Sequence, residues 1–185
     1  MFSHCFLRPV LLFCFGLLLV FQPDQVIAGR QAEEAQLKAA YIYNFGKYVT
    51  WPAKMATGPV KICLLGRQDP MAGSLGKLAG KTIRDRDVTF DVLDSVSAKT
   101  DCEVLFISHS RQEQLAGVLA QLAGHGVLTV SDIQGFAGRG GMIELVKKKN
   151  KIRFIINIDS VRRAGLIISS RLLSLATVLS GEQKP

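Results

Sequence analysis

The 185-residue sequence lacks the patterns on which most enzyme chemistries depend. It has only three histidines, and none of them has the spacing of a metal ligand. The glycine-rich stretch Gly135–Gly141 contains neither the lysine of a phosphate-binding loop nor the dinucleotide-binding pattern. No Gly-x-Ser-x-Gly turn is present to expose a nucleophilic serine. We therefore expect no metal, no cofactor and no enzymatic activity.

Long apolar runs are equally scarce. The only one, residues 9–21, is shorter than the roughly 20 residues that cross a bilayer. Arg8 precedes this run, Pro23 ends it, and Ala28 closes a small-residue cleavage site. The pattern predicts a signal peptide over residues 1–28 rather than a membrane anchor. We expect no stable membrane insertion after its cleavage.

The remaining chain, residues 29–185, is expected to form one domain. Cleavage removes one arginine and one aspartate, so the net charge stays at +8. A basic surface can bind nucleic acid, but an exported protein rarely meets any, and we expect no nucleic-acid partner. Much of the charge lies in Lys147–Lys151, which is typical of a hairpin tip. Acidic partners or anionic lipid headgroups are alternatives to an ordinary solvated face.

Four cysteines become two when the signal peptide leaves. Cys5 and Cys14 are lost, while Cys63 and Cys102 remain. An even number in an oxidising compartment favours one disulfide, which would close a loop of about 40 residues. A pair of buried free thiols is the alternative.

Apolar periodicity predicts alternating helices and strands. A helix over residues 33–50 would present one apolar face, formed by Leu37, Ala40, Tyr41, Phe45 and Tyr48. Strands are expected at residues 60–66, 88–93, 103–108 and 127–130, and helices at residues 70–79 and 111–123. A hairpin is expected from residues 142–146 and 151–157. Asp159 or Ser160 is expected to begin a last helix that continues through Leu175.

This alternation predicts an α/β fold: a single three-layer domain with a mostly parallel sheet, flanking helices and a C-terminal antiparallel hairpin. In the strand order 2-1-3-4, the strand with Cys63 lies beside the strand that Cys102 precedes. Neighbouring strands are about 4.8 Å apart, a separation that a disulfide can bridge. Fold and cysteine count therefore both favour the disulfide.

Polar side chains gather at the expected carboxyl ends of the strands, where such sheets bind ligands. They are Ser108, His109, Ser110, Ser131 and Asp132. A Ser/His/Asp set suits a hydrolase, but the exposed serine turn is missing and Asp132 suits an ordinary turn. A response regulator would need an aspartate where Ser108 stands. A small-molecule-binding module that uses Ser108 and Ser131 is the first alternative function, and a hydrolase is the less favoured one.

Apolar residues on and after the expected hairpin form a second group. Ile143, Ile155 and Val161 lie at the end of the sheet, where we expect little coverage. Each one singly suits the core, but together, beside a basic turn, they are candidates for a partner-binding patch. A set of aromatic residues either fills the core or anchors an interface, and we favour the core for most of them: Tyr41, Tyr43, Phe45, Tyr48 and Trp51.

A series of motifs also occurs in a specific order along the chain. They are Ala39–Pro52, Ile62–Gly66, Cys102–Phe106, Leu128–Asp132, Phe136–Val146 and Arg153–Ala176. Together they cover roughly residues 33–176, and they resemble the YfiR-like family of periplasmic bacterial proteins. The resemblance implies a non-enzymatic protein that binds the periplasmic sensor domain of a membrane-anchored diguanylate cyclase. Binding would hold the cyclase inactive and so lower cyclic di-GMP and biofilm formation.

The resemblance also implies roles for individual residues. Cys63 and Cys102 match a disulfide pair of the family, and Ile143, Ile155 and Val161 match the region that grips the sensor. A homodimer stays open as an alternative assembly.

The chain departs from the family at one pair of positions. Some members carry a second cysteine pair where this chain has Ala137 and Glu144. No redox sensing by a second disulfide is therefore expected here.

Overall fold

The computed structural model describes residues 24–55, 57–149 and 151–181. The chain divides into two units, residues 1–31 and residues 32–185, and the fold below is that of the second. Most of the predicted signal peptide lies outside the described residues, so its cleavage stays a prediction. None of the helices in the described ranges is long and apolar enough to cross a membrane.

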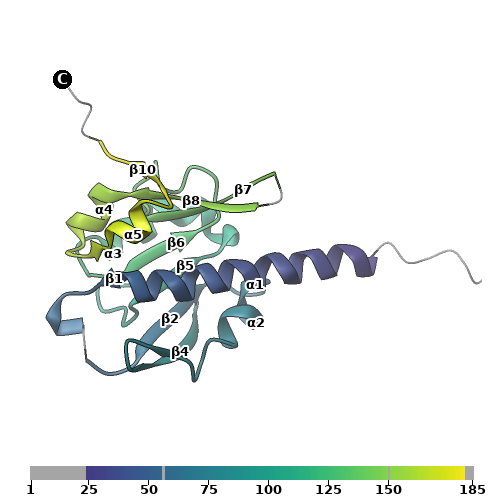
Figure 1. The fold of residues 1–185 in the computed structure, drawn as a ribbon, viewed down its shortest axis with the longest axis horizontal. Coiled ribbons are helices and arrows are strands. Elements are labelled where there is room, and N and C mark those ends of the chain that lie inside the picture. Colours follow the sequence, from purple (N-terminus) through teal and green to yellow (C-terminus); the bar gives the residue numbers. More distant parts are fainter. Residues whose placement is uncertain (1–23, 56, 150, 182–185) are drawn as a thin grey trace, which may run out of the picture. The chain divides into compact units, whose positions relative to one another are not determined.

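An eight-stranded sheet with the order β10-β8-β7-β6-β5-β2-β4-β3 forms the centre of the fold (Figure 1). Its strands are β2 (Val60–Leu65), β3 (Thr82–Ile83), β4 (Arg86–Leu93), β5 (Val104–Ile107), β6 (Leu128–Ser131), β7 (Ile143–Lys148), β8 (Lys151–Asn157) and β10 (Thr177–Leu179). Strands β4, β2, β5, β6 and β7 are parallel, β8 is antiparallel to β7, and β10 is parallel to β8. The predicted order 2-1-3-4 and the hairpin are confirmed.

Helices cover both faces of this sheet. They are α1 (Asp24–Tyr48), α2 (Met71–Gly76), α3 (Leu115–Leu122), α4 (Ile158–Arg163) and α5 (Ser170–Leu173), with two 3-10 helices, η1 (Ala53–Met55) and η2 (His109–Gln114). One apolar cluster joins the sheet to α1, α2, α4 and α5, and a second joins the opposite face to α3. The predicted α/β class with three layers is confirmed.

The buried face of helix α1 is rotated from the one predicted, and Phe45 is the predicted residue that is fully buried. Ala35, Ala39, Ile42 and Phe45 are buried, whereas Leu37 is 46 % exposed. The two alanines let the helix backbone approach the sheet closely, and they are too small to dominate an apolar pattern. The predicted tyrosines lie at the margin of the stripe, because their hydroxyl groups require polar partners. The hydroxyl of Tyr41 donates to the Ile152 carbonyl at 3.2 Å.

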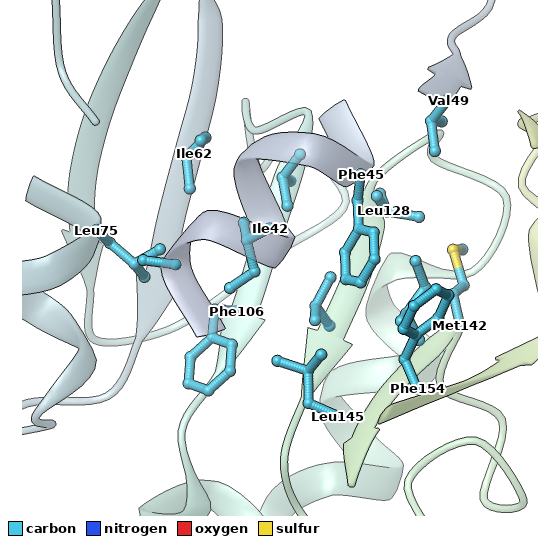
Figure 2. Close-up of a cluster of buried hydrophobic side chains, with 14 of the residues drawn as sticks. Ile42, Phe45, Val49, Ile62, Leu75, Phe106, Leu128, Met142, Leu145 and Phe154 are labelled. Atoms are coloured by element: carbon cyan, nitrogen blue, oxygen red, sulfur yellow. The ribbon is translucent and has the colours of Figure 1, made fainter. Parts of the chain in front are cut away.

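The buried side of α1 packs on strands from both halves of the sheet. Figure 2 shows Ile42 and Phe45 pointing between Phe106 of β5 and Phe154 of β8. The rings of Phe45 and Phe154 meet edge to face, with 5.1 Å between centroids. The helix thereby joins the parallel strands to the hairpin in one core.

The prediction of one last helix from Asp159 or Ser160 through Leu175 is wrong, because the helix that begins there ends at Arg163. Asn157 caps a short α4, since its side chain accepts from the Ser160 backbone N–H at 3.0 Å. After α4 come β9 (Ile167–Ile168), α5 and β10. Strand β9 pairs with β1 (Val49–Thr50) in a separate two-stranded sheet.

A glycine ends helix α4. Gly165 has φ +72°, and its N–H donates to the Arg162 carbonyl at 2.9 Å. The next N–H, of Leu166, donates to the Val161 carbonyl at 3.1 Å. These two hydrogen bonds form a Schellman motif, which ends a helix and turns the chain away. The β-branched pair Ile167 and Ile168 then favours a strand.

A buried carboxylate joins three strands where they begin. The Glu103 side chain accepts from the Lys61 backbone N–H and from the Arg86 guanidinium, each at 2.7 Å. The indole of Trp51 donates to the Glu103 carbonyl at 3.2 Å. Because a buried charge is costly unless it is paired, this cluster specifies the arrangement of β2, β4 and β5.

The predicted disulfide is present. Cys63 of β2 and Cys102, two residues before β5, are bonded with their Cα atoms 6.1 Å apart. Both residues are buried in the cluster beneath α3. The bond therefore joins two neighbouring parallel strands on the face opposite α1.

We predict that alanine substitutions in α1 separate the observed face from the predicted one. Ile42→Ala should lower the free energy of unfolding by about 2–5 kcal/mol, because it leaves a cavity in the core. Leu37→Ala should change it by less than about 0.5 kcal/mol, because that side chain is largely in solvent. Denaturant unfolding measures both. Equal losses in the two variants would contradict the assigned face.

We predict that the disulfide is the only redox-sensitive element of stability in the part of the chain described. Replacing Cys63 and Cys102 by serine should lower the free energy of unfolding by about 2–5 kcal/mol. A reductant should bring the native protein to the level of this variant and leave the variant itself unchanged. The prediction is contradicted if the native protein is equally stable before and after reduction, once thiol titration has verified that the disulfide is fully reduced.

Candidate partner-binding site

The serines at the strand ends form hydrogen bonds within the fold. The Ser108 hydroxyl caps η2 by accepting from the Ser110 backbone N–H at 3.2 Å. The Ser131 hydroxyl donates to the Ile107 carbonyl at 2.7 Å and accepts from the Ile133 N–H at 3.1 Å. Both residues are buried. These contacts give the serines a structural use and do not favour a ligand site at this edge.

Asp132 faces helix α1 rather than a histidine. Its carboxylate accepts from the Lys38 ammonium at 2.7 Å, and Glu34 binds the same ammonium at 2.7 Å. Burial would lower the pKa of Lys38, but the hydrogen bonds to Asp132 and Glu34 outweigh it and hold that pKa above its ordinary value. These three charged groups therefore link α1 to the end of β6 through two ion pairs. It does not orient His109 as a catalytic base.

The three predicted contact residues do not form one surface. Ile143 and Val161 are completely buried in the cluster under α1. Ile155 is half-buried and faces the opposite side, because the register pairs Ile143 with Ile156 and Ile155 with Glu144. The expectation of a poorly covered hairpin was wrong, since β10 pairs along β8 where a helix was predicted. A role in binding for the three residues stays a prediction.

A different set of apolar side chains is exposed. Ile167, Leu175, Val178 and Leu179 are 67 %, 67 %, 46 % and 39 % exposed. We call residues 167–179 the C-terminal segment. It contains four of the six large hydrophobic residues exposed in the described ranges, the others being Leu37 and Val92. The sequence did not predict this exposed segment, because its apolar residues have helical spacing and the region was predicted to be a helix.

The turn before β7 is held by a buried carboxylate. Glu144 is only 4 % exposed, and its oxygens accept from the backbone N–H groups of Gly135 at 2.9 Å and Ala137 at 3.0 Å. Ala137 and Glu144 are the two positions at which the family resemblance implies a second cysteine pair in some members. Hydrogen bonds thus join the two positions here without a disulfide.

The fold and these contacts define an α/β domain with a disulfide. Ser108, Ser131 and Asp132 at the strand ends form hydrogen bonds or ion pairs within the fold. The chain belongs to the YfiR/HmsC-like family, whose model matches residues 35–177. This is a family of periplasmic, regulatory proteins without catalytic function, and membership is consistent with a regulator of cyclic di-GMP signalling. The resemblance stated from the motifs is confirmed.

A solved structure has the same fold at low sequence identity. It is the crystal structure of a conserved domain protein from Vibrio cholerae O1 biovar El Tor str. N16961, with 12 % identity and a TM-score of 0.52. The match covers 79 % of this chain and 60 % of that one, so this chain spans less than two thirds of the other's length. At this identity the likeness concerns the fold alone.

We predict that Glu144→Gln destabilises the protein by about 1–3 kcal/mol. An amide offers one acceptor oxygen where the carboxylate offers two, so one backbone N–H of the turn loses its partner. Glu113→Gln, at an exposed position of η2, is the matched control and should have little effect. Chemical denaturation compares the two. Equal stability of both variants and the native protein would show that the Glu144 contacts contribute nothing.

Proposed function

We propose that this protein represses a membrane-anchored diguanylate cyclase by binding its periplasmic sensor domain. Family membership supports the regulatory class. The observation that carries the proposed contact is the exposed apolar C-terminal segment. Apolar groups concentrated at one place on a protein surface are typical of a site that another protein covers.

The edge of the sheet offers backbone contacts as well. Strand β10 is the outermost strand of the described sheet, with only β8 as its neighbour. Its outer N–H and C=O groups face away from the sheet, and an extended segment of a partner can pair with them. Val178 and Leu179 lie on this same strand. Backbone pairing and apolar contact therefore occur together.

Charge restricts the chemistry of the partner. Residues 143–181 contain eight lysines and arginines but only two acidic residues, a net charge of +6 out of +8 for the whole chain. One of the two acidic residues, Glu144, is buried. Arg171 lies within the C-terminal segment, and the other seven basic residues precede it in the chain. A partner with an apolar surface and acidic surroundings would therefore complement residues 143–181 as a whole, and the attraction would raise the association rate.

Repression follows from unequal affinity for two states of the cyclase. A protein that binds the inactive sensor conformation more tightly shifts the equilibrium toward it, by about 1.4 kcal/mol for each tenfold difference in affinity. The repressor needs no chemistry of its own. Ile155 lies in register with Thr177 of β10, so of the three predicted contact residues it is nearest to this surface. Ile143 and Val161 support the surface from the core.

A pair of valine substitutions tests the proposed surface. Val178→Asp places a charge on the C-terminal segment, while Val92→Asp does so on β4, where the side chain is equally exposed at 48 % against 46 %. In cells that lack the native protein, cyclic di-GMP should be raised. Val92→Asp should restore the low level and Val178→Asp should fail to do so. Binding of each purified variant to the sensor domain should follow the same order.

The abundance and melting temperature of both variants serve as folding controls. Unchanged cyclic di-GMP on deletion of the protein would overturn the proposed repression. A fully active Val178→Asp variant would instead overturn the contact surface and leave repression standing.

A further inference from the structure

A cleft of about 530 Å³ lies apart from the C-terminal segment's exposed side chains. It opens between α3, the turn before β7 and helix α4, near the ends where β6 and β7 begin. Its volume is within the range of small-molecule sites, roughly 300–1,000 Å³. It lies away from the strand carboxyl ends, where the sequence had suggested a ligand.

One wall of the cleft is apolar and made of small side chains. Three residues of α3 line this wall, Ala116, Leu119 and Ala120, and so does Ala123, which follows the helix. Leu115 and Val118 of α3 are buried in the core beneath the helix and do not line the cleft. Alanine at these positions leaves the space that the cleft occupies.

The remaining lining includes two arginines. Arg139 comes from the turn before β7 and Arg163 from α4, and no carboxylate lines the cleft. One nitrogen of Arg139 donates to the Gln112 carbonyl at 3.2 Å, and one of Arg163 donates to the Ser160 hydroxyl at 2.9 Å. Neither guanidinium forms a salt bridge with any carboxylate of the described residues. Both keep further N–H donors for a ligand.

The backbone that carries Arg139 is held firmly. Gly141 lies against the ring of Phe136, where an added Cβ atom would come within 2.2 Å of the ring. Glu144 binds the same turn from below through the N–H groups of Gly135 and Ala137. The turn therefore presents Arg139 from a fixed position, and a ligand pays little ordering cost.

We propose that this cleft binds a small amphipathic organic anion, with a carboxylate or phosphate head and an apolar body. Guanidinium groups bind planar carboxylate and phosphate oxygens through paired, charge-assisted hydrogen bonds. The head lies between Arg139 and Arg163, where the Ser160 hydroxyl can donate a further hydrogen bond. The apolar body covers the alanine wall of α3. The site goes beyond the proposed repression and does not depend on it.

Four probes test the proposal on the purified secreted protein. Octanoate and octyl phosphate carry the two candidate heads, octanol has the body without charge, and inorganic phosphate has the charge without a body. Titration calorimetry and amide chemical shifts should show saturable binding of octanoate, octyl phosphate or both, with shifts in α3, α4 and residues 138–141. Whichever of the two binds more tightly identifies the head. Octanol and inorganic phosphate should each bind at least about tenfold more weakly.

Variants locate the two walls. Arg139→Gln and Arg163→Gln should each weaken binding about tenfold or more, because each removes a charged donor. Arg162→Gln is the matched control, since Arg162 is next in sequence but points to Asp159 and does not line the cleft. Ala120→Leu, at an exposed position, should also weaken binding by filling the space, while both arginines stay intact.

Three results would overturn the proposal. The first is the absence of saturable binding of either anionic probe. The second is octanol binding as tightly as octanoate. The third is equal binding by the Arg162→Gln and Arg163→Gln variants when both keep the native melting temperature.

Discussion

The packing of α1 across the sheet is the interaction on which the rest of the domain depends. Its buried stripe contacts β5 and β8, strands that lie far apart in the sequence and on either side of the hairpin's first strand. Ala35 and Ala39 bring the helix close, and Ile42 and Phe45 fill the space beneath it. If this stripe were lost, the parallel strands and the hairpin would have no common core on that face. The aromatic contact between Phe45 and Phe154 is therefore central to the topology as well as to stability.

The opposite face is closed by a smaller apolar cluster together with a disulfide and a buried polar contact. Helix α3 has only eight residues, and it covers β2, β5 and the residues that flank β6, with the disulfide beneath it. Beyond β6, the turn before β7 closes the face, held by Gly141 against Phe136 and by the Glu144 carboxylate. A covalent bond and a buried polar contact thus supplement apolar packing on this face, whereas the larger apolar cluster lies under α1. The turn before β7 leaves backbone groups and the Arg139 side chain at the surface, and the cleft lies beside this turn.

The order of the sheet was predictable, because alternating apolar strands and helices leave few ways to build a parallel sheet. The end of the chain was not. Its leucines suit a helix at every third or fourth position, and this pattern hid the Schellman motif at Gly165 and the β-branched pair after it. The wrong prediction of a helix also led to the wrong contact surface. With a helix in place of β10, the hairpin would have been uncovered and Ile143 would have been exposed. In α1 the error had another cause, because small alanines carry little weight in an apolar pattern yet decide which face approaches the sheet.

Helix α4 connects the cleft to the C-terminal segment, the two surfaces proposed here as binding sites. Residues three apart share a face of a helix, so Ser160 and Arg163 both line the cleft, while Val161 is buried in the core. The Schellman motif then leads directly from α4 into the C-terminal segment. A ligand in the cleft therefore contacts the helix from which that segment departs. The ligand can alter the conformation of the C-terminal segment only if it binds one arrangement of α4 more tightly than another. A ligand with equal affinity for two states does not change the equilibrium between them.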